Sequence, residues 1–126
     1  MSNSCQEWIK RAKSSIILAK ESLGEEVFLE DLCFQAQQAA EKSIKSIFIY
    51  FALEFPNTHN FNVLLLKLKG TIDVPAEIQR VIELNDYAVQ TRYPGDYFPV
   101  TKEEYYDAIE IAESVYNWAK MVTKSI

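Results

Sequence analysis

The sequence predicts an all-α fold, an antiparallel up-and-down bundle of four long helices and one short helix. In four long segments, apolar residues recur at steps of three and four, the spacing that lines one side of an α-helix. Glycine, proline and asparagine gather between these segments, where they end one helix and start the next. We find no pair of segments with the alternating pattern that predicts paired β-strands.

The chain has 126 residues, and we expect residues 1–126 to form one helical domain. A net charge of −5 argues against a general nucleic-acid binder, although it leaves room for a local basic site. No apolar run approaches the roughly 20 residues of a membrane span, and the polar start lacks a signal-peptide pattern. Cys5 and Cys33 are too few for a disulfide framework or a metal site. We therefore expect a cytoplasmic protein that needs no membrane, metal or cofactor.

The first two predicted helices cover about residues 5–23 and 28–53. The apolar stripe of the first comprises Cys5, Trp8, Ala12, Ile16, Ala19 and Leu23. The second has an apolar arc too wide for one neighbour, which predicts a central position. Its opposite side carries a narrow band of polar residues: Asp31, Gln35, Gln38, Lys42 and Lys45. Such a band is either the solvated face of an amphipathic helix or a ligand-binding face.

A break at residues 56–60, which contains His59, precedes a short predicted helix at about residues 61–69. A fourth helix is expected to follow from Pro75. Its apolar stripe comprises Val74, Ile78, Val81, Ile82 and Val89. Asn85 falls within that stripe, where it must find hydrogen-bond partners or lose about 1–3 kcal/mol in desolvation. Since Arg92 falls on the same side two turns later, we expect Asn85 to join a buried polar cluster with Arg92 as a candidate member.

The last predicted helix begins with a capping box formed by Thr101 and Glu104. Its inward stripe comprises Tyr105, Ala108, Ile109, Ala112, Val115, Tyr116, Ala119 and Val122. Four further apolar residues fall beside the inward stripes: Ile17, Tyr106, Ile111 and Trp118. They provide more apolar surface than one small bundle easily hides, which predicts a homodimer.

Residues 91–99 form the most unusual segment, with three aromatic residues and a Pro-Gly turn. An irregular, aromatic and charged loop on a helical scaffold is a common place for ligand binding. The alternative is that it only connects two helices. Its candidate ligand residues are Arg92, Tyr93, Asp96 and Tyr97.

Three ordered motifs together resemble the HEPN family, the higher eukaryotes and prokaryotes nucleotide-binding domain. They are residues 38–46, then Thr58-His59-Asn60-Phe61, then Arg92-Tyr93-Pro94 ahead of the capped last helix. The resemblance runs from Trp8 to about Ala119. It implies an all-α bundle that commonly dimerises, and a separately encoded minimal nucleotidyltransferase as partner, the two acting as a toxin–antitoxin pair. It also implies binding of a nucleotide or RNA.

Some HEPN proteins resemble metal-independent ribonucleases in which a histidine follows an arginine by four to six residues. Such a histidine can move a proton near neutral pH, and the arginine can neutralise a phosphate. Here no histidine follows Arg92 at that spacing, and the only histidine of the chain, His59, precedes Arg92. Ribonuclease activity is therefore disfavoured and we assign no catalytic residue. His59 either contacts a ligand or only caps a helix or bonds its loop.

The main functional prediction is a non-catalytic nucleotide- or substrate-binding partner of the nucleotidyltransferase. Phosphate contacts would come from lysine and arginine, base stacking from tyrosine, and base-edge contacts from Gln38 or Asp96. The candidate ligand residues are Gln38, Lys42, Lys45, His59, Asn85, Arg92, Tyr93, Asp96 and Tyr97. Two alternatives stay open: a HEPN ribonuclease toxin, and a structural module whose acidic last helix and apolar flank bind a partner protein.

Overall fold

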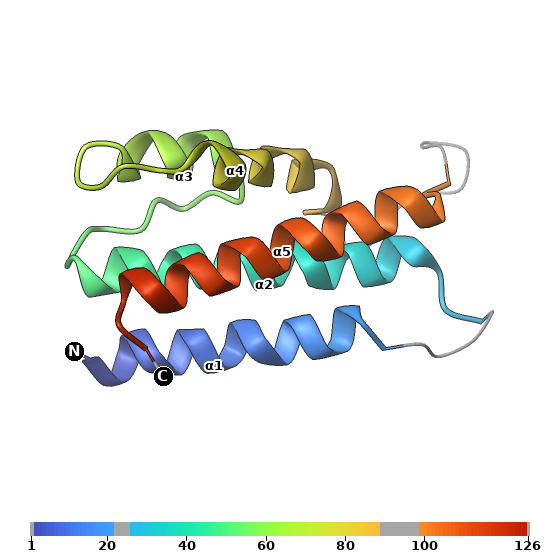
Figure 1. The fold of residues 1–126 in the computed structure, drawn as a ribbon, viewed down its shortest axis with the longest axis horizontal. Helices are drawn as coiled ribbons and strands as arrows, with labels where there is room; N and C mark the ends of the chain where they lie inside the picture. Colours follow the sequence, from blue (N-terminus) through green and yellow to red (C-terminus); the bar gives the residue numbers. More distant parts are fainter. Residues whose placement is uncertain (1, 22–25, 89–98, 126) are drawn as a thin grey trace.

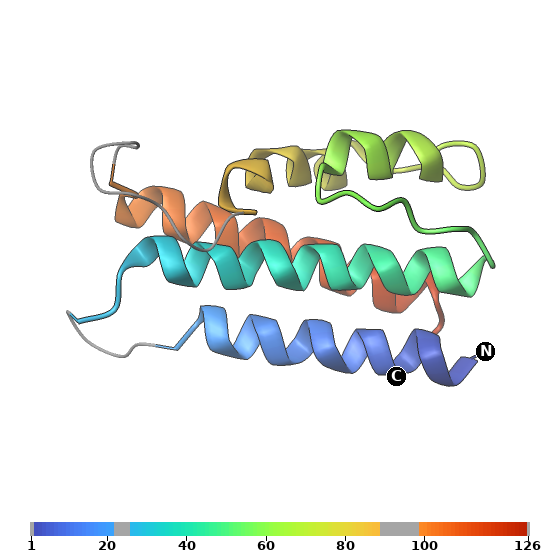
Figure 2. The same ribbon diagram turned by 180° about the vertical axis from the view of Figure 1, so that it is seen from behind.

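The computed structural model describes residues 2–21, 26–88 and 99–125, and all regular structure in these ranges is helical (Figure 1). The helices are α1 (Ser2–Ala19), α2 (Leu29–Tyr50), α3 (Phe61–Leu68), α4 (Ala76–Gln79), the 3₁₀-helix η1 (Arg80–Tyr87) and α5 (Lys102–Val122). The long helices α1, α2 and α5 lie side by side, and α3, α4 and η1 form a second layer along α2 and α5 (Figures 1 and 2). The predicted all-α bundle is confirmed.

The chain direction alternates through the bundle. α1 and the α4–η1 segment run one way, whereas α2 and α5 run the other way (Figure 1). None of the helices in the described ranges is long and apolar enough to cross a membrane. The capping box predicted for α5 is confirmed by both of its bonds. The Glu104 N–H donates to Thr101 Oγ1 at 3.1 Å, and the Thr101 N–H donates to Glu104 Oε1 at 2.9 Å.

α2 is the central helix, as its wide apolar arc predicts. Eleven of its residues are buried, including the small residues Ala36, Ala39, Ala40 and Ser43, which let α1 and α5 approach closely. α2 ends at Tyr50, earlier than its predicted end near residue 53. Ala52 adopts a positive φ of 56°, and the Leu53 N–H donates to the Phe48 carbonyl at 2.8 Å, which closes the helix.

The predicted fourth long helix is instead a single α-helical turn, α4, that continues as η1. A 3₁₀-helix has three residues per turn, so residues at steps of three share one side. The buried side accordingly follows Ile78, Val81 and Leu84, and Leu84 is 1% exposed. Ile82, which the α-helical period places inward, is 40% exposed, so that prediction was wrong. Val89 lies outside the described residues.

Two other predictions from the apolar stripes need correction. Ile111 and Trp118 are buried within this one chain, so they are no surplus surface for a partner. The second layer of helices packs on α5 in addition to α1 and α2, so a larger part of the α5 surface is buried. Ile17 and Tyr106 do remain exposed. On α1 the inward stripe also includes Ile9, which the prediction omitted, while Leu23 lies outside the described residues.

The register of η1 can be tested by two alanine substitutions. Leu84→Ala should lower the free energy of unfolding by about 2–5 kcal/mol, because it leaves a cavity in the core. Ile82→Ala should cost less than about 1 kcal/mol, because Ile82 is 40% exposed and its loss leaves no closed cavity. Urea unfolding of both variants measures these values. A larger loss for Ile82→Ala than for Leu84→Ala would indicate a regular α-helix in place of η1.

Candidate functional site

One side of α2 brings together polar and aromatic residues from α2, α1 and the loop at residues 51–60. We call this set the α2 polar face. Its members are Trp8, Arg11, Ser15, Gln37, Gln38, Glu41, Lys42, Lys45, Phe55 and His59. It includes four of the residues predicted from the sequence as ligand contacts: Gln38, Lys42, Lys45 and His59.

Glu41 is the centre of a hydrogen-bond chain on this face. His59 Nδ1 lies 2.7 Å from Glu41 Oε1, and the same oxygen accepts a bond from Gln37 Nε2 at 3.0 Å. Gln38 Nε2 donates in turn to Gln37 Oε1 at 2.8 Å. Gln37 is fully buried and the Glu41 side chain is 16% exposed, whereas the His59 side chain is 66% exposed. This series of hydrogen bonds therefore connects the protein interior to an accessible imidazole.

Lys42 connects α2 to α1. Its ammonium donates to Ser15 Oγ at 2.8 Å, and Ser15 is buried on α1. Partial burial lowers the pKa of Lys42, the nearby Arg11 lowers it further, and Glu41 acts in the opposite direction. Lys42 is therefore half-buried and connects two helices. It does not fit the alternative in which this band of α2 is only a solvated helix face.

Lys45 lies above two aromatic rings at the end of the α2 polar face nearest the end of α2. Its ammonium is 4.4 Å from the centre of the Trp8 ring and 5.2 Å from that of Phe55. Arg11 also lies over Trp8, at 5.8 Å. Such cation–π contacts fix the position of a cation while leaving its outer side available to an anion. Phe55 is itself held by an edge contact with Phe48, which is fully buried.

Asn85 lies on η1 and acts at the start of α3. Its Oδ1 accepts a bond from the Phe61 N–H at 2.8 Å, and its Nδ2 donates to Asn62 Oδ1 at 2.8 Å. Asn60 Oδ1 accepts a bond from the Asn62 N–H, also at 2.8 Å. Asn85 thus belongs to a half-buried polar cluster that caps α3. It contacts that helix end and takes no part in the contacts that define the α2 polar face.

Four of the predicted ligand residues, Arg92, Tyr93, Asp96 and Tyr97, lie outside the described residues and stay predictions. Sequence reasoning missed other members of the α2 polar face, among them Gln37, Glu41 and Ser15. Gln37 and Glu41 are four residues apart and so share a side of the helix, which is a usable signal. No local sequence pattern identifies Ser15 as a member, because its partner Lys42 is 27 residues away.

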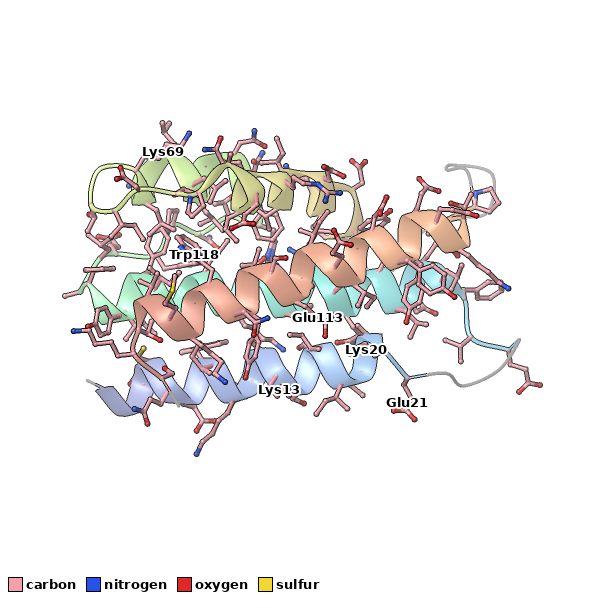
Figure 3. All side chains as sticks on the ribbon, in the orientation of Figure 1. Lys13, Lys20, Glu21, Lys69, Glu113 and Trp118 are labelled. Carbon is pink, nitrogen blue, oxygen red and sulfur yellow. The ribbon has the colours of Figure 1, made fainter. Side chains whose placement is uncertain are left out.

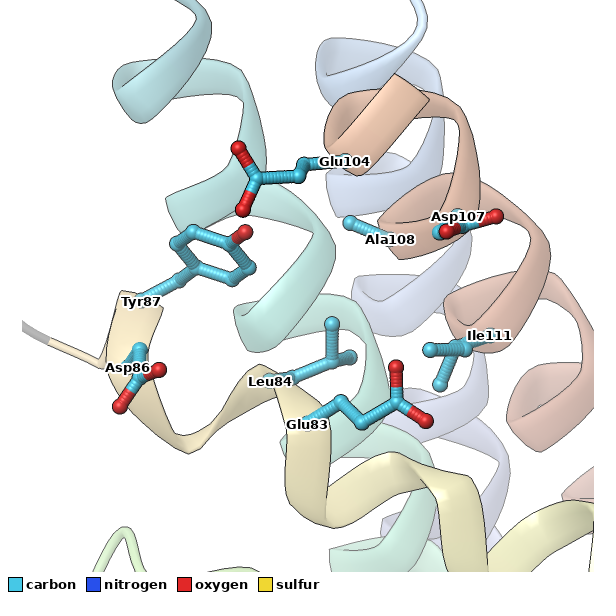
Figure 4. A pocket seen from close by; sticks show the side chains of 8 residues that line it. All are labelled: Glu83, Leu84, Asp86, Tyr87, Glu104, Asp107, Ala108 and Ile111. Carbon is cyan, nitrogen blue, oxygen red and sulfur yellow. The ribbon is translucent and has the colours of Figure 1, made fainter. Parts of the chain in front are cut away.

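A second concave feature has the opposite charge. A cavity of about 140 Å³ lies between η1 and α5, with Leu84, Ala108 and Ile111 among its lining residues (Figure 4). Four carboxylates surround it, and we call them the acidic rim: Glu83, Asp86, Glu104 and Asp107. In the part of the chain that the structure describes, no group of three or more His, Cys, Asp or Glu side chains is placed to hold a metal ion. The acidic rim would repel a phosphate.

The sequence model of the HEPN domain matches residues 5–122, almost the whole chain. This chain belongs to the HEPN family. The HEPN domain described here resembles two solved structures over nearly their full lengths. TT1696 from Thermus thermophilus is 28% identical, with a TM-score of 0.79, over 95% of this chain and 98% of that one. ST0689, an archaeal HEPN homologue, is 26% identical, with a TM-score of 0.74, over 94% of this chain and 97% of that one. No curated protein matches the sequence.

The electrostatic environment of Lys42 in this HEPN domain can be tested by NMR. Arg11→Ala should raise the pKa of Lys42, since it removes a neighbouring positive charge, and Glu41→Gln should lower it, since it removes a negative one. The measurement is a pH titration of the lysine side-chain carbon signals. Lys69→Ala, at an exposed lysine beyond α3, serves as the control and should leave Lys42 unchanged. A Lys42 that titrates with the exposed lysines would contradict its partial burial.

Proposed function

We propose that this HEPN domain is the non-catalytic, nucleotide-binding partner of a separately encoded minimal nucleotidyltransferase, with the two forming a toxin–antitoxin type pair. One observation carries the binding part of the proposal. Three cations, Arg11, Lys42 and Lys45, lie on the α2 polar face together with Gln38 and His59. These residues come from two helices and a loop, and their side chains suit the recognition of a phosphate and a polar neighbour.

The cations are held in place before any ligand binds. Ser15 fixes the Lys42 ammonium, and the rings of Trp8 and Phe55 fix the Lys45 ammonium. A cation that is already ordered loses less side-chain entropy when it binds a phosphate. The proposal also includes residues of the loop at 91–99, whose contacts are predicted from the sequence alone. Arg92 would contact a phosphate, Tyr93 or Tyr97 would stack on a base, and Asp96 would contact the base edge.

The assignment as non-catalytic rests on the placement of histidine. The ribonuclease pattern needs a histidine shortly after the arginine, and the sequence has none after Arg92. The only histidine is on another loop, where Glu41 binds its Nδ1. Ribonuclease activity remains the alternative, and loss of RNA cleavage in Arg92→Ala would identify it.

The acidic rim supports the proposal that the domain binds a partner protein. Its four carboxylates are on a different set of helices from the cations of the α2 polar face, so one surface suits an anionic ligand and the other a basic protein surface. Ile17, Leu18 and Tyr106 are each at least half exposed, which supports the predicted homodimer even though Ile111 and Trp118 are buried. Cys5 and Cys33 are both buried in the bundle, in keeping with the predicted cytoplasmic location, where thiols stay reduced.

The binding proposal predicts saturable binding of labelled ATP or a short RNA that weakens as salt rises. Arg11→Ala and Lys45→Ala should each weaken binding by about three- to tenfold, which corresponds to the loss of roughly 0.7–1.4 kcal/mol. Fluorescence anisotropy measures these affinities. Lys69→Ala removes an exposed positive charge at the end of α3 (Figure 3), outside the α2 polar face, and should have no effect. Equal losses in all three variants would mean that only net charge matters, and absence of saturable binding would refute the proposal.

The partner proposal predicts that a nucleotidyltransferase encoded beside this gene co-purifies with the HEPN domain. Charge reversal at two positions of the acidic rim, Glu83→Lys and Asp107→Lys, should release that partner, whereas nucleotide binding should persist. Lys45→Ala should weaken nucleotide binding and leave the complex with the partner intact. Co-expression followed by size-exclusion chromatography tests this. A complex that survives the reversal would place the contact elsewhere on the domain.

A further inference from the structure

The bond between His59 and Glu41 determines which nitrogen of the imidazole carries the proton. A carboxylate can only accept hydrogen bonds, so the His59 Nδ1 that lies 2.7 Å from Glu41 Oε1 must be the protonated nitrogen. In the neutral imidazole the other nitrogen, Nε2, is then an acceptor. The His59 side chain is two-thirds exposed, so this acceptor is accessible to a ligand.

The orientation of Glu41 is fixed from inside the protein. Its Oε1 accepts a second bond from Gln37, which is fully buried, and Gln37 accepts one from Gln38. A carboxylate oxygen that accepts two bonds, one of them from a buried donor, keeps its direction. The tautomer of His59 is therefore set by a buried network, and changes on the surface would not easily reverse it.

Capping of α3 does not require His59. Asn60 caps the helix through the Asn62 N–H, Asn85 accepts a bond from the Phe61 N–H, and the Asn60 N–H donates to Thr58 Oγ1. These bonds define the loop on either side of His59 and leave its imidazole available. The sequence alternative in which His59 caps a helix is therefore not what the structure shows, although His59 does bond its loop to α2.

The other members of the α2 polar face differ from His59 in what they offer to a ligand. Lys42 and Lys45 carry only donors, and so does Arg11, whose Nε pairs with Glu7 at 3.2 Å. The remaining N–H groups of these cations suit a phosphate. The Nε2 atom of His59 is an acceptor and needs a donor on the ligand. A hydroxyl group can donate to Nε2 and accept from Gln38 or a lysine at the same time, whereas a base amino group can only donate. The face thus matches a phosphate with a hydroxyl group beside it.

We infer that His59 Nε2 accepts a hydrogen bond from the 2′-hydroxyl of a ribonucleotide, so that the α2 polar face prefers ribonucleotides to deoxyribonucleotides. The inference rests on the proposed nucleotide-binding function. The 2′-hydroxyl is the hydroxyl that every ribonucleotide unit offers, whether free or within an RNA chain, and its absence defines DNA. Glu41 and Gln37 act as positioning residues, since they orient His59 and would not touch the ligand.

The test compares ribose and deoxyribose ligands on the same protein variants. ATP with dATP, and a short RNA with the DNA of matching sequence, should bind the unaltered protein with a preference of about five- to tenfold for ribose, the range expected for one hydrogen bond. His59→Ala should bring this ratio close to one and leave the affinity for the deoxy ligand unchanged. Lys45→Ala should weaken both ligands equally and keep the ratio.

A second measurement does not depend on ligand binding. Because His59 is the only histidine, nitrogen NMR of labelled histidine reports its tautomer without assignment ambiguity. The proton should be on Nδ1 in the unaltered protein. In Glu41→Gln the amide can present a donor, so the Nε2–H tautomer should become populated and the ribose preference should fall. A proton found on Nε2 in the unaltered protein would overturn the inference.

The outcomes separate this inference from the proposed function. Equal affinity for ribose and deoxyribose ligands, with binding still weakened by Lys45→Ala, would overturn the role of His59 and leave nucleotide binding standing. Absence of saturable binding for every ligand would refute the proposed function and the inference together. If His59→Ala lowers the melting temperature, His59→Phe keeps a ring without an acceptor and should give the same ratio near one.

Discussion

The burial of α2 between its neighbours is the constraint on which the rest of this structure depends. Eleven residues of this helix are buried, and three of them, Gln37, Ser43 and Ser46, are polar. A polar group inside a protein must be hydrogen-bonded or it destabilises the fold. Ser43 and Ser46 bond to carbonyls of α2 itself, whereas Gln37 bonds outward to Glu41. Among the described residues no buried side-chain nitrogen or oxygen lacks a partner.

That constraint also shapes the α2 polar face. Since α1 and α5 cover most of α2, only a narrow band of its surface can carry charge, and the loop at residues 51–60 borders that band. The positive φ of Ala52 turns the chain back along α2, which places His59 beside Glu41. The result is an ordered set of cations and one oriented imidazole, on a helix that is itself held rigidly by the core.

Prediction from sequence succeeded where the cause of a structure is local. The capping box of α5 depends on Thr101 and Glu104, three residues apart, and the central position of α2 follows from its own apolar pattern. Prediction failed where contacts between distant segments decide the outcome. η1 replaces an α-helix, so Leu84 is buried instead of Ile82, and Trp118 is covered by a layer whose position no local pattern reveals.

The sequence alone determined the helical class, the HEPN resemblance and the polar band of α2, because helix periodicity and ordered motifs are local properties of the chain. It also named Gln38, Lys42, Lys45 and His59 as candidates. Only the tertiary structure decided what these residues do together. In the folded chain Lys42 bonds to Ser15, Lys45 lies over Trp8, and Glu41 bonds to His59 Nδ1 and so determines its tautomer. Those partners are far apart in the sequence, and packing of α1, α2 and the loop is what brings them together.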